Sequence, residues 1–586
     1  MKKSLCYCII VFLTLLTYAN TLNNQFAYDD VSVIVENDFI TSWDNLRAFF
    51  SRDYFNGAGE QSYRPLVTLS YFIDYQVWGK NPFGYHLTNL ILHLTVLFAT
   101  LMLARKFIVD QTILMIGGII FGCHPVLTEA VCSITFREDI QSTLFFVLAL
   151  WGYISFRNSN RISWFAVILP AFVFSLLAKE MGIAFIPAIG IYEVFTRKKP
   201  AVLFNFIFIL TAIILIALLF FMLRFTIMNN PHDTAQLTRF NGLTACKILL
   251  AYWQLYFFPI ELRALYYPRL LFHHAGDVLL CITALLIGIG YFFLLKPEKK
   301  RTALLLFLIS FSLFSPVMNI YPIRHIIAER YAYMPASIFC YCLALLITTP
   351  FSGRYRIYSV AIICCILSIF SIRTVLRNSI WKHNLALWFY TAKHNPWLAE
   401  AYFSLGHAYH MRNRYTDAIK CYKKSLKENR DYVDSYINLG RLYVDQGNNE
   451  EAIAYYKIAL SYQSNNPLIH YNIGIAYDNV GNDEKALAHL ERCIAIEPKH
   501  YKAYNALGSF YIKRNNLKQA EYYWRKAIDV NPQFKEGYVN VGSLYANVGL
   551  TDQARYFWQK ALEIDPNYET PKKHLQSLEK MLKIQN

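Results

Sequence analysis

The stretch GYHLTNLILHLTVLFATLMLA, residues 84–104, decides the fold class because it is apolar over the length that an α-helix needs to cross a bilayer. Similar segments occupy residues 202–222, 277–295 and 357–375. Of the 586 residues, 55% are hydrophobic and only 17% are charged, and the mean hydropathy is +0.26. That composition is too apolar for an ordinary soluble enzyme and predicts an all-α, polytopic membrane protein.

Short basic loops follow several apolar segments and set the expected orientation. These loops are Arg105–Lys106, Arg157–Arg161, Arg197–Lys199, Lys296–Arg301 and Arg354–Arg356. Cytoplasmic loops are enriched in Lys and Arg, so this placement explains the net charge of +17 more simply than a nucleic-acid partner does. Lys2 and Lys3 place the N-terminus in the cytoplasm by the same rule. Because no A-x-A cleavage motif follows, we expect an uncleaved first span rather than a removed signal peptide.

An arrangement of about 11 spans keeps every basic loop on the cytoplasmic side. The expected spans are about 5–22, 85–104, two that flank an outer loop at 132–138, two that flank Lys179–Glu180, then 202–222, 277–295, 302–316, 332–349 and 357–375. Segment 246–260 would break the alternation, so we expect an interfacial or re-entrant helix there. An odd number of spans places the C-terminal region on the exoplasmic side, in a bacterial periplasm or the endoplasmic reticulum lumen.

From residue 399 the apolar runs stop and a 34-residue period begins. Three residue types recur at this interval: Gly406, Gly440, Gly474, Gly508 and Gly542; Tyr409, Tyr443, Tyr477, Tyr511 and Tyr545; and Ala418, Ala452, Ala486, Ala520 and Ala554. This is the tetratricopeptide pattern of two antiparallel helices per repeat. Such repeats stack into an α-solenoid whose concave face binds extended peptides or protein surfaces, which predicts a polypeptide partner.

The expected domain organisation follows from these two patterns. Residues 1–378 form the membrane domain, with a first outer loop at 23–83. Residues 379–398 connect it to five repeats at 399–568, and residues 569–586 form a capping helix. The 12 cysteines show no CxxC or Cys/His metal spacing, so we expect no metal site built from them.

The polar residues of the membrane domain sort onto the exoplasmic side in this topology. They are Asp29, Asp30, Arg64, His86, Glu129, Arg137, Glu138, Asp139, Lys179, Glu180, Glu329 and Arg330. Ionisable residues near membrane depth are candidates for a functional site. A transporter places its charges near the midplane of the bilayer. The long first loop instead suits an enzyme that works where a lipid headgroup meets water.

Seven short motifs occur in an order that resembles a known family. They are FAYDD (26–30), SYRPL (62–66), FGYHLTNLILH (83–93), HPVLTEAV (124–131), FREDI (136–140), AKEMGI (178–183) and AERYAYMP (328–335). Together with the repeats, they resemble the transmembrane and tetratricopeptide-repeat-containing protein O-mannosyltransferases of the glycosyltransferase C (GT-C) superfamily. The resemblance covers nearly the whole chain and implies a GT-C-like membrane domain.

The resemblance implies a reaction. A sugar, with mannose favoured, passes from a polyprenyl- or dolichyl-phosphate carrier to a Ser or Thr hydroxyl of a protein, with inversion. An acidic residue of the first outer loop acts at the acceptor in this superfamily, which nominates Asp29 and Asp30. A hydroxyl that attacks an anomeric carbon needs a carboxylate to take its proton, and the leaving phosphate needs fixed cations. We expect no required cofactor, with a divalent cation at Asp29 and Asp30 as an alternative.

The remaining candidates divide by the role that we expect. The candidates for the lipid phosphate are Arg64, Arg137, Lys179 and Arg330. The candidates for the sugar or the acceptor are His86, His93, His124, Glu138, Asp139, Glu180 and Glu329. Each has a structural alternative: the aspartates as caps, the histidines as packing residues, and the other charges as ion pairs such as Lys179–Glu180 or Glu329–Arg330.

One segment departs from the family pattern, and two other functions stay open. FFPIELRALYYPR (257–269) has Leu265 and Tyr266 where family members tend to carry an acidic residue, which puts acceptor or sugar specificity in doubt. The first alternative is transfer of a lipid-linked sugar or oligosaccharide to a glycan, lipid or pilin-like acceptor. The second is a non-enzymatic, membrane-anchored repeat scaffold. In every case we expect membrane lipids, and no nucleic acid, as partners.

Overall fold

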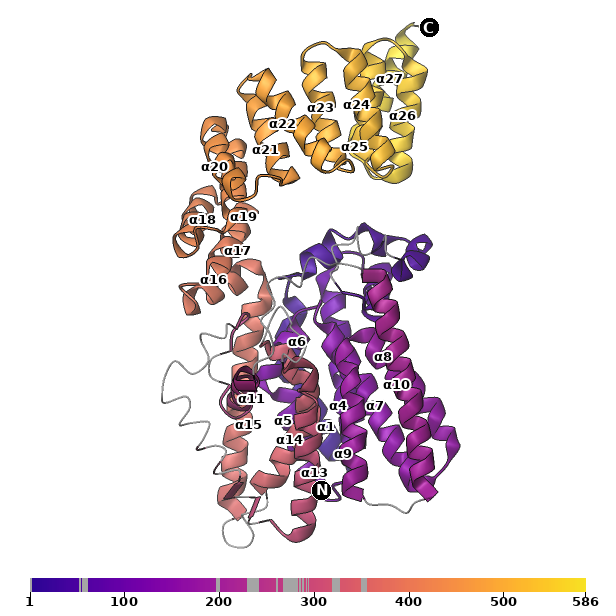
Figure 1. The fold of residues 1–586 in the computed structure, drawn as a ribbon, viewed down its shortest axis with the longest axis vertical. Helices are drawn as coiled ribbons and strands as arrows, with labels where there is room; N and C mark the ends of the chain where they lie inside the picture. Colours follow the sequence, from indigo (N-terminus) through magenta and orange to yellow (C-terminus); the bar gives the residue numbers. More distant parts are fainter. Residues whose placement is uncertain are drawn as a thin grey trace. The chain divides into compact units, whose positions relative to one another are not determined.

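The chain folds into two compact units, Met1–His394 and Asn395–Asn586 (Figure 1). The structure is a computed structural model. It describes residues 3–51, 62–196, 201–228, 242–259, 262–266, 295–318, 327–348 and 356–585, with single residues at 54 and between 283 and 293. Within these ranges every regular element is a helix, so the predicted all-α fold is confirmed.

The first unit is a bundle of helices. Its α-helices are α1 (Lys3–Tyr18), α3 (Pro65–Trp78), α4 (Pro82–Ala104), α5 (Gln111–Cys123), α6 (Thr128–Cys132), α7 (Arg137–Ser159), α8 (Phe165–Ala178), α9 (Phe185–Thr196), α10 (Ala201–Met228), α11 (Gly242–Phe257), α13 (Pro297–Ser312), α14 (Tyr333–Thr348), α15 (Arg356–Asn378) and α16 (Asn384–His394). Short 3-10 and π turns join them, among them η2 (Val31–Val35), η7 (Glu180–Ala184), η11 (Glu329–Ala332) and η13 (Ser379–Lys382).

Seven helices of the described chain are long and apolar enough to cross a membrane, and an eighth span arises if the bent pair α5–α6 counts as one. The pair bends by 45° where His124 and Pro125 interrupt it. The expectation of about 11 spans also counted three other segments. Two of them are the shorter helices at 162–178 and 185–196. The third, 277–295, lies largely outside the described residues, so this part of the expected topology stays a prediction.

Charged groups are sorted between the two ends of the bundle. At one end the Arg105 guanidinium lies 4.9 Å from the centroid of the Tyr7 ring, Arg157 pairs with Glu193, and Arg301 donates to the Phe195 carbonyl. The N-terminus lies at this end, and the first loop lies at the opposite end (Figure 1). Arg105, Arg157 and Arg301 of the basic turns therefore share one end, whereas the first loop with Asp29 and Asp30 lies at the other.

The first loop is anchored by its own small core. Ile34, Tyr54, Val67 and Tyr71 are buried together with Tyr85 at the start of α4. Burial of an aromatic ring of this size contributes about 2 kcal/mol. The loop is therefore packed against the helices rather than extended into solvent, and it delivers residues 27–30 to a fixed place.

The end of α15 and the residues after it contact the first helix and the first loop. The Asn378 amide at the end of α15 donates to the Thr17 carbonyl of α1 at 2.9 Å, and the Gln25 N–H of the first loop donates to the Lys382 carbonyl at 2.8 Å. The expected connector, 379–398, thus lies mostly within the first compact unit, which extends to His394.

The second unit is a stack of helix pairs. It consists of α17 (Ala399–His410), α18 (Tyr415–Glu428), α19 (Val433–Asp445), α20 (Asn449–Tyr462), α21 (Pro467–Asn479), α22 (Asp483–Ile496), α23 (Tyr501–Lys513), α24 (Leu517–Val530), α25 (Lys535–Asn547), α26 (Thr551–Ile564) and α27 (Glu569–Gln585). The periodic glycines permit the close approach within each pair. A Cβ on Gly440 would lie 2.5 Å from the Tyr456 ring, and one on Gly508 would lie 2.4 Å from the Trp524 ring.

Candidate active site

The Asp30 carboxylate fastens the first loop to the loop between α6 and α7. Its Oδ2 accepts from the Ala27 N–H at 3.1 Å, and its Oδ1 accepts from the Thr135 N–H at 2.9 Å and from the Ser133 hydroxyl at 3.4 Å. Asp30 is fully buried. Burial raises its pKa to about 7, although the hydrogen bonds from Ala27 and Thr135 act in the opposite direction.

Asp29 occupies a different environment from its neighbour. It is exposed, and its carbonyl accepts from the Val33 N–H at 3.0 Å. The turn depends on Tyr28, which has a φ of 60° in the left-handed region and whose N–H donates to the Asn384 side chain at 2.6 Å. The two adjacent carboxylates therefore have distinct positions: Asp30 faces the protein interior, and Asp29 faces solvent.

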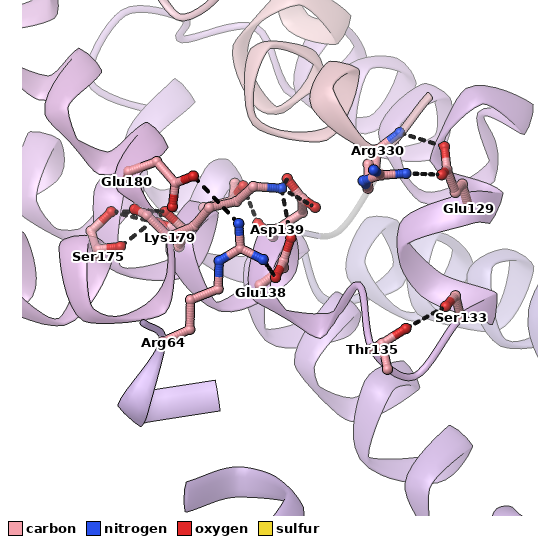
Figure 2. A network of polar contacts seen from close by, with 12 residues as sticks. Arg64, Glu129, Ser133, Thr135, Glu138, Asp139, Ser175, Lys179, Glu180 and Arg330 are labelled. Carbon is pink, nitrogen blue, oxygen red and sulfur yellow. Dashed lines mark hydrogen bonds and ion pairs between the residues drawn. The ribbon is translucent and has the colours of Figure 1, made fainter. Parts of the chain in front are cut away.

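Figure 2 shows a network of charges at the start of α7 and the end of α8. Lys179 Nζ contacts both carboxylate oxygens of Asp139 at 2.7 Å and Glu138 Oε1 at 2.9 Å. Arg64 pairs with Glu138 and, at 3.4 Å, with Glu180. The alternative of a Lys179–Glu180 pair is wrong, because Lys179 pairs with Glu138 and Asp139 and Glu180 pairs with Arg64.

Local backbone geometry brings these side chains together. Glu138 and Asp139 stand in the first turn of α7, where a helix favours negative charge. Lys179 ends α8, and the chain then turns tightly through Gly182. A Cβ on Gly182 would lie 2.9 Å from the carbonyl carbon of Ser175, so only glycine fits this turn.

Opposite charges keep Lys179 and Glu180 ionised despite their burial. Burial alone lowers the pKa of Lys179, but Asp139 and Glu138 outweigh it, and the net pKa is raised. Burial alone raises the pKa of Glu180, but Arg64 and then Arg224 outweigh it, and the net pKa is lowered. Arg224, near the end of α10, lies 3.3 Å from Glu180. The cations are therefore held in fixed positions by carboxylates.

Arg330 connects this network to the acid pair of the first loop. Its backbone N–H donates to Glu129 Oε2 at 2.9 Å, and its guanidinium pairs with the same carboxylate. The guanidinium lies 4.1 Å from the centroid of the Phe136 ring and 5.1 Å from that of Tyr331. Arg330 pairs with Glu129, not with Glu329 as one alternative expected.

Aromatic rings bridge the remaining distance. Lys179 Nζ lies 4.9 Å from the centroid of the Tyr331 ring, so Lys179 and Arg330 both lie against one aromatic side chain. On the other side the Tyr28 ring packs against Phe136 with centroids 5.8 Å apart. Lys179, Tyr331, Arg330, Phe136 and Tyr28 thus form one continuous patch, and Asp29 and Asp30 directly follow Tyr28 in the chain.

Arg137 lies elsewhere, inside the helix bundle. Its guanidinium contacts Asp74 at 2.6 Å, the Asn89 side chain at 2.6 Å, the Ser70 hydroxyl at 3.1 Å and the Tyr85 carbonyl at 3.0 Å. It is fully buried, and its hydrogen bonds hold α3, α4 and α7 together. The structure does not bring Arg137 to the patch with Arg330.

The three histidines also lie in packed surroundings. His93 Nδ1 shares a hydrogen bond of 2.7 Å with the Tyr333 hydroxyl, and its ring contacts Phe121. His124 contacts the Tyr256 carbonyl through Nε2 at 3.0 Å and accepts from the Val126 N–H at 3.2 Å.

His86 is 1% exposed near the start of α4. His93 and His124 fit their structural alternative as packing residues, whereas a sugar or acceptor role for His86 stays a prediction.

Glu329 forms a separate buried group beside the patch. Its Oε1 accepts from the Tyr266 hydroxyl at 2.7 Å and from Arg377 at 3.1 Å. Tyr266 stands in the segment where the sequence lacks the expected acidic residue, and Glu261 of that segment lies outside the described residues. The Tyr266 hydroxyl therefore contacts a carboxylate that comes from another part of the chain.

Several members of these groups carry no local signal in the sequence. Arg224 contacts Glu180, Tyr331 contacts Lys179, and Arg377 contacts Glu329. The two members of each pair are more than 40 residues apart in the sequence. No group of three or more His, Cys, Asp or Glu residues that could hold a metal ion occurs in the described part of the chain. The alternative of a divalent cation at Asp29 and Asp30 is not tested by this geometry.

Comparison with known proteins supports both halves of the sequence prediction. Tetratricopeptide repeat models match residues 399–432, 421–454, 467–500, 501–534 and 536–568, and a TPR repeat model matches residues 440–481. The C-terminal third therefore consists of tetratricopeptide repeats.

The relatives extend the similarity into the membrane unit. The chain is 27% identical to the Caenorhabditis elegans protein O-mannosyl-transferase F38B6.6, over 72% of this chain and 63% of that protein. It is 25% identical to mouse protein O-mannosyl-transferase TMTC3, over 72% of this chain and 51% of that protein. A stretch of 200 residues is 34% identical to Xenopus laevis protein O-mannosyl-transferase tmtc2, over 32% of this chain and 24% of that protein.

The chain spans about half to 63% of the length of the first two relatives. The motif order read from the sequence, the apolar helices and the repeats thus all point to the same group of proteins. The predicted resemblance to the protein O-mannosyl-transferases is confirmed over 72% of the chain.

Proposed function

We propose that this protein is a membrane glycosyltransferase that transfers mannose from a polyprenyl- or dolichyl-phosphate carrier to Ser or Thr hydroxyls of a protein, on the exoplasmic side of the membrane. The names of the relatives support protein O-mannosylation. One observation carries the proposal. Asp29 lies between Tyr28, whose ring packs against Phe136, and Asp30, whose carboxylate accepts a hydrogen bond from the Thr135 N–H. The guanidinium of Arg330 lies over the ring of the same Phe136.

Asp29 is the better general base of the pair. A base must reach the acceptor hydroxyl, and Asp29 is exposed whereas both oxygens of Asp30 accept hydrogen bonds from buried backbone groups. In this scheme the acceptor oxygen attacks the anomeric carbon and its proton passes to Asp29. Asp30 is then a positioning residue, because it fixes the turn that presents Asp29.

Cations stabilise the leaving phosphate in the same scheme. The bond between the anomeric carbon and the phosphate oxygen breaks with inversion, and negative charge develops on the lipid phosphate. Arg330 lies nearest the acid pair along the chain of contacts, and Arg64 is more exposed than Arg330 and Lys179. Lys179 is 3% exposed, so it acts by holding Glu138 and Asp139 rather than by direct contact with the donor.

In this proposal the array of repeats binds the acceptor protein. Tetratricopeptide solenoids bind peptides on their concave face. We therefore assign recruitment of the acceptor protein to residues 399–568 and transfer to the membrane unit.

The test is transfer by the purified full chain in nanodiscs. With dolichyl-phosphate-mannose and a Ser/Thr-rich peptide, we expect a mass gain of one hexose on the peptide, sensitive to alkaline elimination and unaffected by a chelator. Transfer of a longer oligosaccharide, or to lipid only, would favour the first alternative function. No transfer to any acceptor, with acceptor proteins still captured, would favour the scaffold.

A further inference from the structure

The turn that presents Asp29 is held by a residue from a distant part of the chain. Tyr28 has a φ of 60°, in the left-handed region that residues other than Gly, Asn and Asp seldom adopt. Its N–H donates to the Asn384 side-chain oxygen at 2.6 Å, and the two residues are 356 positions apart in the sequence. Asn384 is the first residue of α16 and is half-buried. A side chain of α16 therefore supports a backbone conformation that the local sequence does not favour.

The same helix also contacts the Tyr28 side chain. The centroid of the Tyr28 ring lies 5.6 Å from that of Trp388, which is buried. Asn384 and Trp388 are related as i and i+4, so they lie on one face of α16. That face therefore offers both a hydrogen-bond acceptor to the Tyr28 backbone and a ring to its side chain.

The segment that carries Asn384 is itself packed against the bundle. Trp381, just before α16, is 1% exposed, and its ring centroid lies 6.4 Å from that of Phe136. The next residue, Lys382, accepts from the Gln25 N–H at 2.8 Å. Leu387 of α16 is fully buried. Contacts on both sides of Asn384 therefore fix the position from which it supports the turn.

We propose that Asn384 is a positioning residue for catalysis, which acts through Tyr28 on the direction of the Asp29 carboxylate. The inference rests on the proposed function, in which Asp29 is the general base, and it adds α16 to the elements on which the rate depends. Asp29 directly follows Tyr28, so the φ and ψ of Tyr28 set the direction in which Asp29 points. Without the Asn384 acceptor, Tyr28 returns to a negative φ and turns Asp29 away from the acceptor hydroxyl. Displacement of a catalytic group by about 1 Å is enough to slow a reaction severely.

The first test compares two variants of Asn384 in the full chain in nanodiscs. Asn384→Leu has a similar size and removes the acceptor, whereas Asn384→Asp retains an oxygen that accepts from the Tyr28 N–H. At about pH 8 an added carboxylate leaves Asp29 ionised. We expect Asn384→Leu to lower kcat for mannose transfer about tenfold or more, with KM for donor and peptide unchanged, and Asn384→Asp to keep most of the rate. An unchanged kcat in Asn384→Leu, or equal losses in the two variants, would overturn the proposal.

Asn20→Leu is the matched control. The Asn20 amide donates to the Val375 carbonyl at 3.0 Å, so this residue also joins the start of the chain to the region of α15 and α16. That hydrogen bond lies outside the Tyr28 turn, and we expect kcat to stay unchanged. A loss of kcat in Asn20→Leu as large as that in Asn384→Leu would show that general contact between the two segments controls the rate, which would overturn the proposal.

Hydrogen–deuterium exchange separates this inference from the proposed function, because it requires no transfer. We expect the segment 26–30 to exchange about tenfold faster in Asn384→Leu than in the unaltered chain, and at the unaltered rate in Asn20→Leu. Faster exchange in a protein whose unaltered form transfers no mannose would support the role of Asn384 in the turn and reject the proposed function. Exchange of 26–30 that Asn384→Leu leaves unchanged would overturn the inference, whether or not mannose is transferred.

Discussion

The buried Asp30 carboxylate makes the stability of the first loop dependent on pH. Its pKa is about 7 in the folded protein against 3.8 for an ordinary aspartate. Between these values the folded chain retains a proton that the unfolded chain has released. Stability therefore falls as pH rises from about 4 to about 7, by roughly 4 kcal/mol for a shift of this size.

The comparison that isolates Asp30 uses Asp30→Asn. Because the variant lacks the titrating group, we expect its thermal unfolding temperature in detergent to fall less between pH 5 and pH 8 than that of the unaltered chain. Other titratable groups contribute equally to the pH dependence of both proteins, so the difference between the two profiles reports on Asp30. Parallel pH profiles for the two proteins would show that Asp30 is ionised, and solvated, throughout this range.

At the residue scale, the sequence predicted which charged residues lie close together better than it predicted the partner that each of them contacts. Arg64, Glu138, Asp139, Lys179 and Glu180 do meet, because helix ends on one side of a bundle are forced together. Arg137 does not join them, although it is adjacent to Glu138. Its side chain points into the bundle because the first turn of α7 places it towards α3 and α4, and only tertiary packing sets that rotation.

At the scale of elements, the glycine of each repeat determines how closely two helices pack. Replacing Gly440 by Ala places a Cβ 2.5 Å from the buried Tyr456 ring, which must move. We expect Gly440→Ala to lower the free energy of unfolding of the array by about 1–3 kcal/mol. Chemical denaturation of the full chain, followed by tyrosine and tryptophan fluorescence, measures this change.

Gly190→Ala is the matched control, since it adds the same methyl group to a helix. Nothing lies within 4 Å of the position of its Cβ. We expect it to be neutral or to stabilise α9 slightly, by up to about 1 kcal/mol, because Ala has the higher helix propensity. Gly440→Ala and Gly190→Ala with equal effects would show that propensity, not contact with Tyr456, controls the outcome.

The repeats could be predicted element by element, whereas the spans could not. A 34-residue period fixes both helices of a repeat locally, since each small residue faces its own partner helix. Apolar runs in the membrane unit do not say where a helix breaks. His124 and Pro125 bend the pair α5–α6 by 45°, and the segments at 162–178 and 185–196 form helices shorter than a span.

At the scale of the whole molecule, the orientation of the repeats is the main untested expectation. The described basic residues lie at one end of the bundle and the acid pair lies at the other. By the positive-inside rule, this distribution predicts that the first loop is exoplasmic. We expect a membrane-impermeant maleimide to label Cys421, a partly exposed cysteine of the repeats, in spheroplasts of a bacterial host.

A cysteine introduced by Ser159→Cys, at the basic end of the bundle, is the control for this labelling. It should react only after the membrane is permeabilised. Labelling of Cys421 that also requires permeabilisation would place the repeats in the cytoplasm and would separate them from an exoplasmic acceptor.

In the proposed mechanism Asp29 takes the proton of the acceptor hydroxyl, and Asp30 holds Asp29 in position. The most direct measurement is the rate of mannose transfer by Asp29→Asn in nanodiscs at saturating donor and acceptor. We expect kcat to fall by about 10²-fold or more while the unfolding temperature and peptide binding stay unchanged. Asp30→Asn should lower kcat less and change the unfolding temperature. Undiminished kcat in Asp29→Asn would show that another group takes the proton.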